Sequence, residues 1–172
     1  MKEKLNKIKR RQLTLFLSES CSSEIEKCRE KFNSEQFKLI KAHITLCRED
    51  EIEELEKINA NLNKMCFKSF DLKIGKPIRF SDNKGVLIPV VGNEVIFQNL
   101  RTEILNGVIE FPRSQKPHIT IMHPRNSSCT TEIFQTITNL KFPNKLRFNK
   151  INLIEQTFGE SWTILKEYKL KN

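Results

Sequence analysis

The feature that most constrains this chain is a short segment that occurs twice. Residues 41–47 read KAHITLC and residues 116–122 read KPHITIM, so Lys, His, Ile and Thr recur at matching positions. The sequence contains 3 histidines, and two of them stand in these copies. In a β-strand, residues i and i+2 point to the same side, about 7 Å apart. Each copy therefore places an imidazole and a hydroxyl side by side on one face of a strand.

Apolar and polar residues alternate through both copies, as they do in half-buried strands. The apolar positions are Ile40, Ala42, Ile44 and Leu46 in a strand predicted over residues 37–47, and Ile119 and Ile121 in a strand predicted over residues 117–122. The positions that alternate with them are Lys41, His43, Thr45 and Cys47 in the first strand, and His118, Thr120 and Met122 in the second. Burying the apolar sides leaves both His-x-Thr pairs on the opposite side, and we expect them to point into one cleft.

The rest of the hydrophobic pattern predicts an α/β chain. Further strands are predicted over residues 12–17, 67–80 and 86–91, with a terminal hairpin over residues 146–156 and 162–170. Helices are predicted over residues 23–31, 49–64, 93–105 and 131–140, with turn and cap residues at 18–23. Each half of the chain contains one motif, and no linker rich in Pro, Gly or Ser separates the halves. We therefore expect residues 1–172 to form one domain of two lobes that share a core.

Two imidazoles and two hydroxyls around one cleft are suited to breaking a phosphoester bond without a metal. In-line attack at phosphorus needs a base on the entering oxygen and an acid on the leaving oxygen, on opposite sides of the phosphate. Histidine serves both roles, because its ordinary pKa of about 6.5 allows one ring to be neutral and the other charged near neutral pH. Threonine hydroxyls can hydrogen-bond the non-bridging oxygens. A single His-x-Thr is most often structural, but two copies with matching flanks favour a function.

The candidate catalytic residues are therefore His43, Thr45, His118 and Thr120. The sequence leaves open which histidine is the base, and we favour His118 as base with His43 as acid. Candidate substrate contacts are His123, beside Pro124 at the end of the second strand, and Arg48 and Arg125, which each follow a motif. A plain surface position is the alternative for each arginine, and an inward position on the Ile119 side is the alternative for His123.

Four aromatic residues and one cysteine are further candidates. Phe80, Phe97, Phe158 and Trp162 are able to stack on a nucleobase, although packing in the core or the hairpin is the more ordinary role of each. Phe158 stands in a predicted turn, where it is expected to be exposed. Cys47 follows Thr45 on the motif side, but no base partner identifies it as a nucleophile.

Charge, cysteines and missing motifs narrow the class of protein. A formal net charge of +9 favours anionic partners such as RNA or nucleotides, although a lysine-rich solvated surface explains the charge equally well. The number of cysteines, 5, is odd and no pair has CxxC spacing, which argues against a disulfide framework and a zinc site. No P-loop, GxGxxG or HExxH motif is present, so we expect no cofactor and no metal.

No segment of the sequence predicts membrane association. None approaches the roughly 20 consecutive apolar residues that cross a bilayer. The apolar run at residues 13–17, after the basic segment 1–11, is too short for the core of a signal peptide. We therefore expect a cytoplasmic protein, and nothing in the sequence implies an obligate protein partner.

The paired motifs resemble those of the 2H phosphoesterase superfamily, in particular its bacterial 2′-5′ RNA ligase-like and cyclic phosphodiesterase members. The resemblance rests on His43-Ile44-Thr45-Leu46 and Pro117-His118-Ile119-Thr120-Ile121, and the element order fits nearly the whole chain. It implies a bilobal α/β fold with two antiparallel-rich sheets lining a cleft and helices outside. It also implies His43 and His118 as the catalytic pair, with Thr45 and Thr120 on the phosphate. Many relatives carry a basic residue, often Arg, three positions after the second Thr, where this chain has His123.

The resemblance implies metal-independent hydrolysis or transesterification of cyclic phosphates or 2′-5′ linkages. The leading hypothesis is a phosphodiesterase that hydrolyses 2′,3′-cyclic phosphate ends of RNA or nucleotides. One alternative is a hydrolase of 2′-5′-linked or cyclic oligonucleotides. Another is a non-catalytic nucleotide- or RNA-binding module, which two intact His-x-Thr copies disfavour because a binder has no need of both imidazoles.

Overall fold

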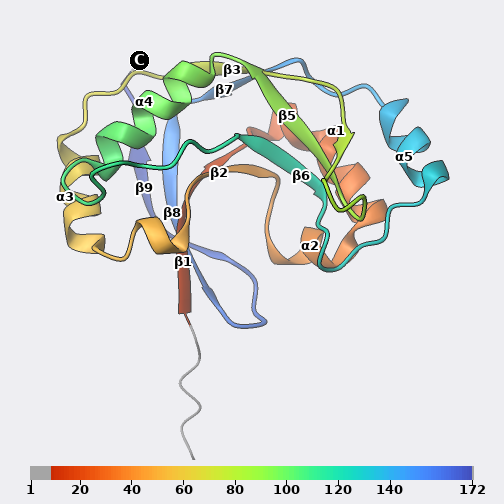
Figure 1. Ribbon diagram of the computed structural model, residues 1–172, viewed down its shortest axis with the longest axis horizontal. Helices are drawn as coiled ribbons and strands as arrows, with labels where there is room; N and C mark the ends of the chain where they lie inside the picture. The colour runs from red at the N-terminus through yellow and green to blue at the C-terminus, as the bar shows by residue number, and fades with distance from the viewer. Residues whose placement is uncertain (1–8, 172) are drawn as a thin grey trace, which may run out of the picture.

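Figure 1 shows a computed structural model that describes residues 9–171. Residues 1–8, most of the basic segment noted above, lie outside the described residues. The strands are β1 (Lys9–Phe16), β2 (His43–Cys47), β3 (Phe70–Ile74), β4 (Ile78–Arg79), β5 (Val86–Gly92), β6 (His118–Met122), β7 (Lys145–Phe148), β8 (Lys150–Thr157) and β9 (Thr163–Lys169). The helices are α1 (Glu19–Phe32), α2 (Ser34–Leu39), the 3-10 helix η1 (Glu49–Glu51), α3 (Leu55–Lys64), α4 (Glu94–Leu105) and α5 (Thr131–Thr138).

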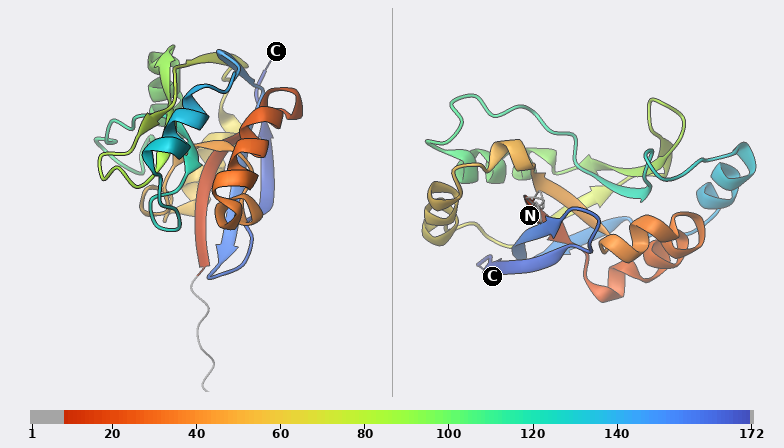
Figure 2. Two further views of the ribbon diagram at one scale, coloured as in Figure 1. Left: turned by 90° about the vertical axis from the view of Figure 1, so that its right-hand side faces the viewer. Right: turned by 90° about the horizontal axis from the view of Figure 1, so that it is seen from below.

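The strands lie side by side in the order β7-β3-β5-β6-β2-β1-β8-β9, and β4 pairs with β5 beside this path. The named strand pairs are antiparallel. The α/β class with antiparallel strands is confirmed, but the two expected sheets are joined into one, because the motif strands β2 and β6 pair with each other. The sheet forms an arch, with α3 and α4 at one end and α1, α2 and α5 at the other (Figures 1 and 2). The division into two lobes stays a prediction.

The motif strands are fixed by burial of their apolar side. Ile44, Leu46, Ile119 and Ile121 are all fully buried. Helix α1 packs against β6 and helix α4 against β2, so one helix contacts each motif strand. Burying one such side chain is worth about 1.5–3 kcal/mol, and a slip by one residue would expose the whole set. The register of both strands is therefore strongly specified, and with it the orientation of the histidines.

Two predicted boundaries before the first motif are wrong. Residues 19–23 are helical rather than cap residues, and residues 37–39 belong to α2 rather than to the strand. Asn33 interrupts the helical segment between α1 and α2 with a φ of −152°. The apolar residues Phe37, Leu39 and Ile40 fit either a short helix or a strand, so periodicity over so few residues does not distinguish them. The strand begins only at His43.

Three later predictions also differ from the structure. The helix expected over 49–64 is split into η1 and α3, because Glu51 turns inward to pair with Arg101 instead of facing solvent. The strand expected over 67–80 breaks at residues 75–77, where a Cβ on Gly75 would lie 2.7 Å from the Val91 side chain. Residues 145–148 form β7, which pairs with β3, so the terminal hairpin consists of β8 and β9.

Candidate active site

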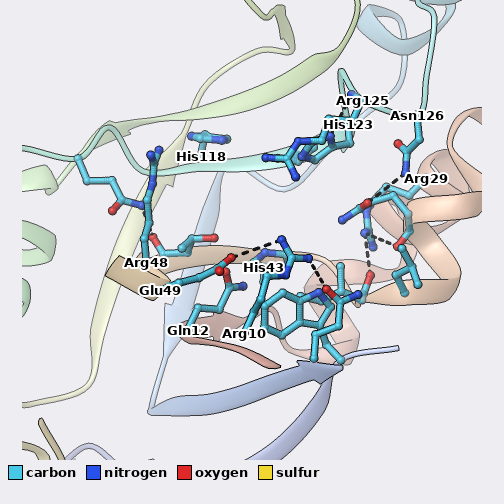
Figure 3. A pocket seen from close by; sticks show the side chains of 18 of the residues that line it. Arg10, Gln12, Arg29, His43, Arg48, Glu49, His118, His123, Arg125 and Asn126 are labelled. Carbon is cyan, nitrogen blue, oxygen red and sulfur yellow. Dashed lines mark hydrogen bonds and ion pairs between the residues drawn. The ribbon is translucent and has the colours of Figure 1, made fainter. Parts of the chain in front are cut away.

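The candidate residues come together in one cleft. A cavity of about 580 Å³ is lined by both motifs and by all three residues named as substrate contacts. These seven residues are His43, Thr45, Arg48, His118, Thr120, His123 and Arg125. Figure 3 shows His43 on one side of the cleft, with His118 and His123 on the opposite side. The expected juxtaposition of the two motifs is therefore present in the structure.

The two motif segments are buried in the same way at every position. Residues 41–47 and 116–122 share one pattern: an exposed Lys, a buried residue, a half-buried His, a buried Ile, a half-buried Thr and two buried residues. The last buried residue of each, Cys47 and Met122, was expected on the motif side and is instead enclosed in the core. Burial raises the pKa of the Cys47 thiol to about 12, so it remains a thiol and not a nucleophile.

Both motif histidines are tethered in the same manner. Nδ1 of His43 lies 2.7 Å from the carbonyl oxygen of Lys41, and Nδ1 of His118 lies 2.9 Å from that of Lys116. A carbonyl oxygen only accepts, so each Nδ1 carries the hydrogen and each neutral ring has its lone pair on Nε2. A phenylalanine also packs edge-on against each ring: Phe16 at 6.0 Å from His43 and Phe80 at 5.7 Å from His118, between ring centres.

The protein groups around the cleft favour neutral imidazoles. Burial lowers the pKa of His43 to about 4, and the charges of Arg29 and the other histidines act in the same direction. Burial likewise lowers the pKa of His118, with Arg48 adding to the effect. The carbonyl tethers oppose both shifts. An anion bound between the rings would restore the charged form, because an opposite charge within about 4–6 Å favours it.

His123 is held in the opposite tautomer. The backbone N–H of Arg125 donates to Nδ1 of His123 over 3.2 Å, so the neutral ring carries its hydrogen on Nε2. Asn33 Oδ1 accepts from the His123 backbone N–H at 2.7 Å, which fixes the chain where it leaves β6. Burial and the Arg125 charge both lower the pKa of His123. His123 is thus arranged as a neutral donor, whereas His43 and His118 are arranged as acceptors.

A largely buried ion pair on α1 holds the segment before the first motif. Glu26 Oε2 lies 2.6 Å from Nη1 of Arg29, and the Arg29 side chain is only 1% exposed. Glu26 Oε1 accepts from the Ala42 backbone N–H at 2.5 Å, and Nη2 of Arg29 donates to the Ile40 carbonyl at 2.7 Å. The Lys41 carbonyl that tethers His43 belongs to the same peptide unit as the Ala42 N–H that Glu26 binds. The pair therefore positions the group that sets the tautomer of His43.

A second buried ion pair holds the two motif strands together. Nη2 of Arg101 lies 2.6 Å from Oε1 of Glu51, and both side chains are at most 2% exposed. Arg101 Nη1 also donates to the Leu46 carbonyl and, over 3.0 Å, to Oε1 of Gln115. Gln115 in turn donates to the Thr45 carbonyl at 2.8 Å. The backbone of the first motif is thereby tied to the residues that precede the second.

Sequence reasoning missed most of this supporting set. The cleft lining also includes Arg10, Gln12, Arg29, Gln36, Gln115, Asn126 and Gln156. For Arg29 a signal was available, since it shares the apolar face of α1 with Ile25 and Cys28 and follows Glu26 by one helical turn.

Among the aromatic candidates, Phe97 is fully buried in the core, Phe158 is 77% exposed and Trp162 lines the cleft.

Within residues 9–171, no three or more His, Cys, Asp or Glu side chains gather as a metal site would require. In the same range no helix is long and apolar enough to cross a membrane.

Comparisons with known proteins place this geometry in a family. Residues 17–160 match the 2′-5′ RNA ligase superfamily. The fold is similar to E. coli LigT complexed with 3′-AMP, with 18% identity and a TM-score of 0.69 over 95% of this chain and 99% of LigT. It is also similar to a phosphoesterase (16% identity, TM-score 0.71, over 96% of this chain and 100% of the other). The protein TT0787 of Thermus thermophilus is similar as well (15% identity, TM-score 0.61, over 95% of this chain and 98% of the other).

The two kinds of match carry different weight. No curated protein matches the sequence. The structural similarities, all below 20% identity, speak for the fold alone. The sequence match, in contrast, spans most of the chain and includes both motif segments. The chain therefore belongs to the 2′-5′ RNA ligase superfamily, which confirms the family that its paired His-x-Thr motifs resemble.

Proposed function

We propose that this chain is a metal-independent phosphodiesterase that opens 2′,3′-cyclic phosphate ends of RNA or nucleotides by hydrolysis. His43 and His118 would be the proton-transfer pair, and Thr45 and Thr120 would hydrogen-bond the non-bridging oxygens. The observation that carries the proposal is the matched tether of the two histidines. Each Nδ1 is held by a carbonyl, and each Nε2 is left to exchange a proton in the same cleft.

The reaction needs one neutral and one charged ring. The neutral histidine takes a proton from water as the water oxygen attacks phosphorus. The bond from phosphorus to one ribose oxygen breaks, and the charged histidine donates its proton to that oxygen. The products are a phosphomonoester and a free hydroxyl; the base now carries the proton from water, the acid has given its proton to the leaving oxygen, and the positive charge has thus changed rings.

The low pKa of His43 favours it as the base. A ring with a pKa of about 4 is neutral near pH 7, which is the form that a base requires. His118 would then be the acid, charged once the phosphate anion is bound beside it. This is the reverse of the assignment favoured from the sequence, and it follows from the burial of His43, which the sequence pattern did not reveal.

The remaining cationic and donor groups suit an anionic substrate. Arg48 and Arg125 are exposed residues that line the cleft, and Arg48 lies close enough to lower the pKa of His118. His123 would donate from Nε2 to a phosphate oxygen, at the position where many relatives carry a basic residue. E. coli LigT, which shares this fold, has been crystallised with 3′-AMP, and a nucleotide of that kind corresponds to one product of the proposed reaction.

A substrate panel tests the proposal. Purified protein is incubated in EDTA with 2′,3′-cyclic mononucleotides, RNA with a 2′,3′-cyclic end, a 2′-5′-linked oligoadenylate and a cyclic dinucleotide, and products are separated by chromatography. Turnover of the 2′,3′-cyclic substrates is expected. Turnover confined to the 2′-5′-linked oligoadenylate or the cyclic dinucleotide would instead support a hydrolase of 2′-5′-linked or cyclic oligonucleotides. Binding of nucleotides without turnover of any substrate would indicate the non-catalytic module.

A further inference from the structure

We propose that Arg10 and Trp162 form a stacking wall for the nucleobase of the substrate. The inference rests on the proposed function, because it adds a base-binding part to the same cleft. Cζ of Arg10 lies 5.4 Å from the centre of the Trp162 ring, and both residues line the cleft that contains the two motifs. Neither belongs to a His-x-Thr segment. Arg10 comes from β1, and Trp162 directly precedes β9.

Contacts on both partners hold the wall in place. Arg10 Nη2 donates to Oε1 of Gln156, and Nη1 lies 3.4 Å from Oε1 of Glu49. The Trp162 backbone N–H donates to the Leu39 carbonyl at 2.8 Å. The hydroxyl of Ser161 donates to the Lys38 carbonyl at 3.0 Å, so the turn before β9 is attached to the end of α2. The wall is therefore formed before any ligand arrives, which lowers the cost of ordering it on binding.

The chemistry of the wall suits a nucleobase better than a second phosphate. Both terminal nitrogens of Arg10 already contact Gln156 or Glu49, so the guanidinium has limited capacity for a bidentate anion. The guanidinium already lies over the Trp162 ring, and 32% of the Arg10 side chain is exposed, so the Arg10–Trp162 pair is accessible from the cleft. Unpaired bases stack on aromatic rings and on guanidinium planes, and such stacking tolerates any base because every base has a π-face.

The wall stands beside the reacting groups. In Figure 3, Arg10 and His43 lie on the same side of the cleft as Gln12 and Glu49, with His118 and His123 across from them. A phosphate between the histidines would place its nucleoside in the same cleft that Arg10 and Trp162 line. Positions 10 and 162 both fall outside the matched residues 17–160, so the family match does not itself assign them a role.

The single tryptophan of the sequence provides a direct readout. The protein is titrated with adenosine 3′-monophosphate, ribose 5-phosphate and inorganic phosphate, and Trp162 fluorescence is recorded. Saturable quenching by the nucleotide, and none by the two probes without a base, is expected. Equal quenching of Trp162 by all three probes would refute the proposed stacking wall. Nucleotide binding that calorimetry detects without any quenching of Trp162 would refute it as well.

Variants separate stacking from charge. Trp162→Ala and Arg10→Ala each remove one stacking partner. Each is expected to weaken nucleotide binding roughly 5- to 150-fold. Arg10→Lys, which keeps the charge but lacks the flat fork, should lose most of the same affinity, while binding of inorganic phosphate stays near wild type. Phe158→Ala is the matched control, because Phe158 occupies the same turn but is 77% exposed and does not line the cleft. Nucleotide binding that survives both Trp162→Ala and Arg10→Lys unchanged would refute the proposal.

The test distinguishes this inference from the proposed function. If the wall exists but the protein has no turnover, the nucleotide still quenches Trp162 and the variants still lose affinity. If the protein is the proposed phosphodiesterase but the wall is wrong, cyclic nucleotides are hydrolysed and Trp162→Ala turns them over with wild-type kcat/KM. Thermal unfolding of each variant checks that a loss of nucleotide affinity or of kcat/KM does not come from a failure to fold.

Discussion

Ile44 of β2 lies directly opposite Ile119 of β6 in the antiparallel pair that joins the two motif strands. Continued by one residue in each direction, this register places His43 across from Thr120 and Thr45 across from His118. The two histidines therefore occupy one diagonal of a square on the sheet face and the two threonines the other. A phosphate over the centre of that square has an imidazole on either side, as in-line displacement requires.

The diagonal arrangement predicts that neither histidine is dispensable. His43→Ala and His118→Ala are each expected to lower kcat about 10²- to 10⁴-fold, the usual contribution of a general acid or base. Steady-state kinetics on a 2′,3′-cyclic nucleotide measures the effect, with circular dichroism as a check on folding. A folded variant that keeps near wild-type kcat would remove that histidine from the mechanism.

The lowered pKa values predict an acid-shifted optimum for the free enzyme. In the active form one histidine of the pair is charged and the other is neutral. This form is most populated at a pH between the two pKa values. Burial lowers the pKa of His43 to about 4 and also lowers that of His118. The ratio kcat/KM is therefore expected to peak below the ordinary histidine pKa of about 6.5, and to fall as pH rises through the higher of the two values.

Bound substrate should shift the pH profile of kcat toward higher pH, opposite to the acid shift expected for kcat/KM. A bound phosphate anion stabilises the imidazolium, which raises both pKa values in the complex. Initial rates across about pH 4 to pH 9, at saturating and limiting substrate, measure the two profiles. A kcat/KM that stays flat from about pH 5 to about pH 8 would contradict catalysis by paired histidines.

Strand periodicity was enough to predict which residues of the motifs share a face. His43, Thr45, His118 and Thr120 follow from the alternation with buried Ile44 and Ile119, because a two-residue period leaves one alternative register and that register would expose the core. The same reasoning failed at Cys47 and at residues 37–39. Near the end of a strand both faces can be covered, and short apolar runs fit a helix equally well.

Apart from Arg29, whose place on the apolar face of α1 is a signal, the supporting residues were beyond the reach of the sequence pattern. Arg29 and Arg101 are charged residues in helices and would ordinarily be assigned to solvent, yet each is 1% exposed. Besides the carboxylates of Glu26 and Glu51, their partners include carbonyls of distant segments, such as that of Leu46 for Arg101. Only the packing of α1 and α4 beside the motif strands brings these groups together, and pairing across the chain is not encoded in local periodicity.

Chelation should leave activity intact. The proposed mechanism moves protons between two imidazoles that must titrate freely, whereas a metal ligand has to remain deprotonated. Turnover after dialysis against EDTA is expected to equal that of the untreated protein, with added Zn²⁺, Mg²⁺ or Mn²⁺ giving no increase. Loss of activity that a divalent ion restores would mean that the histidines bind metal instead.

Removing Arg101 should destabilise the fold far more than removing its exposed neighbour. Arg101→Met leaves the Glu51 carboxylate buried without its main partner, and breaking a buried pair in this way costs about 3–5 kcal/mol. Arg113 also contacts Glu51, at 3.1 Å, but its side chain is 45% exposed. Arg113→Ala should therefore cost no more than about 1 kcal/mol. Urea unfolding of the two variants measures the difference, and equal losses would contradict the assigned role of Arg101.

The Glu26–Arg29 pair should act on catalysis through His43 rather than through stability alone. Arg29→Lys keeps a positive charge beside Glu26 but lacks the fork that reaches the Ile40 carbonyl at 2.7 Å. Small displacements of a catalytic group from mutations outside the site can cost about 10²-fold, so we expect kcat to fall about 10- to 100-fold with a smaller change in KM.

A spectroscopic readout separates positioning from a general loss of structure. In ¹⁵N NMR spectra, wild-type His43 should show the Nδ1–H tautomer, because the Lys41 carbonyl accepts from it. Arg29→Lys is expected to mix the two tautomers of His43 while leaving His118 unchanged. Lys27→Ala is the matched control, since Lys27 forms an equivalent pair with Glu24 one turn apart on the same helix, and both of those side chains are more than half exposed. A fall in kcat without any change in the His43 signals, or an equal effect of Lys27→Ala, would show that the buried pair supports α1 only and does not position His43.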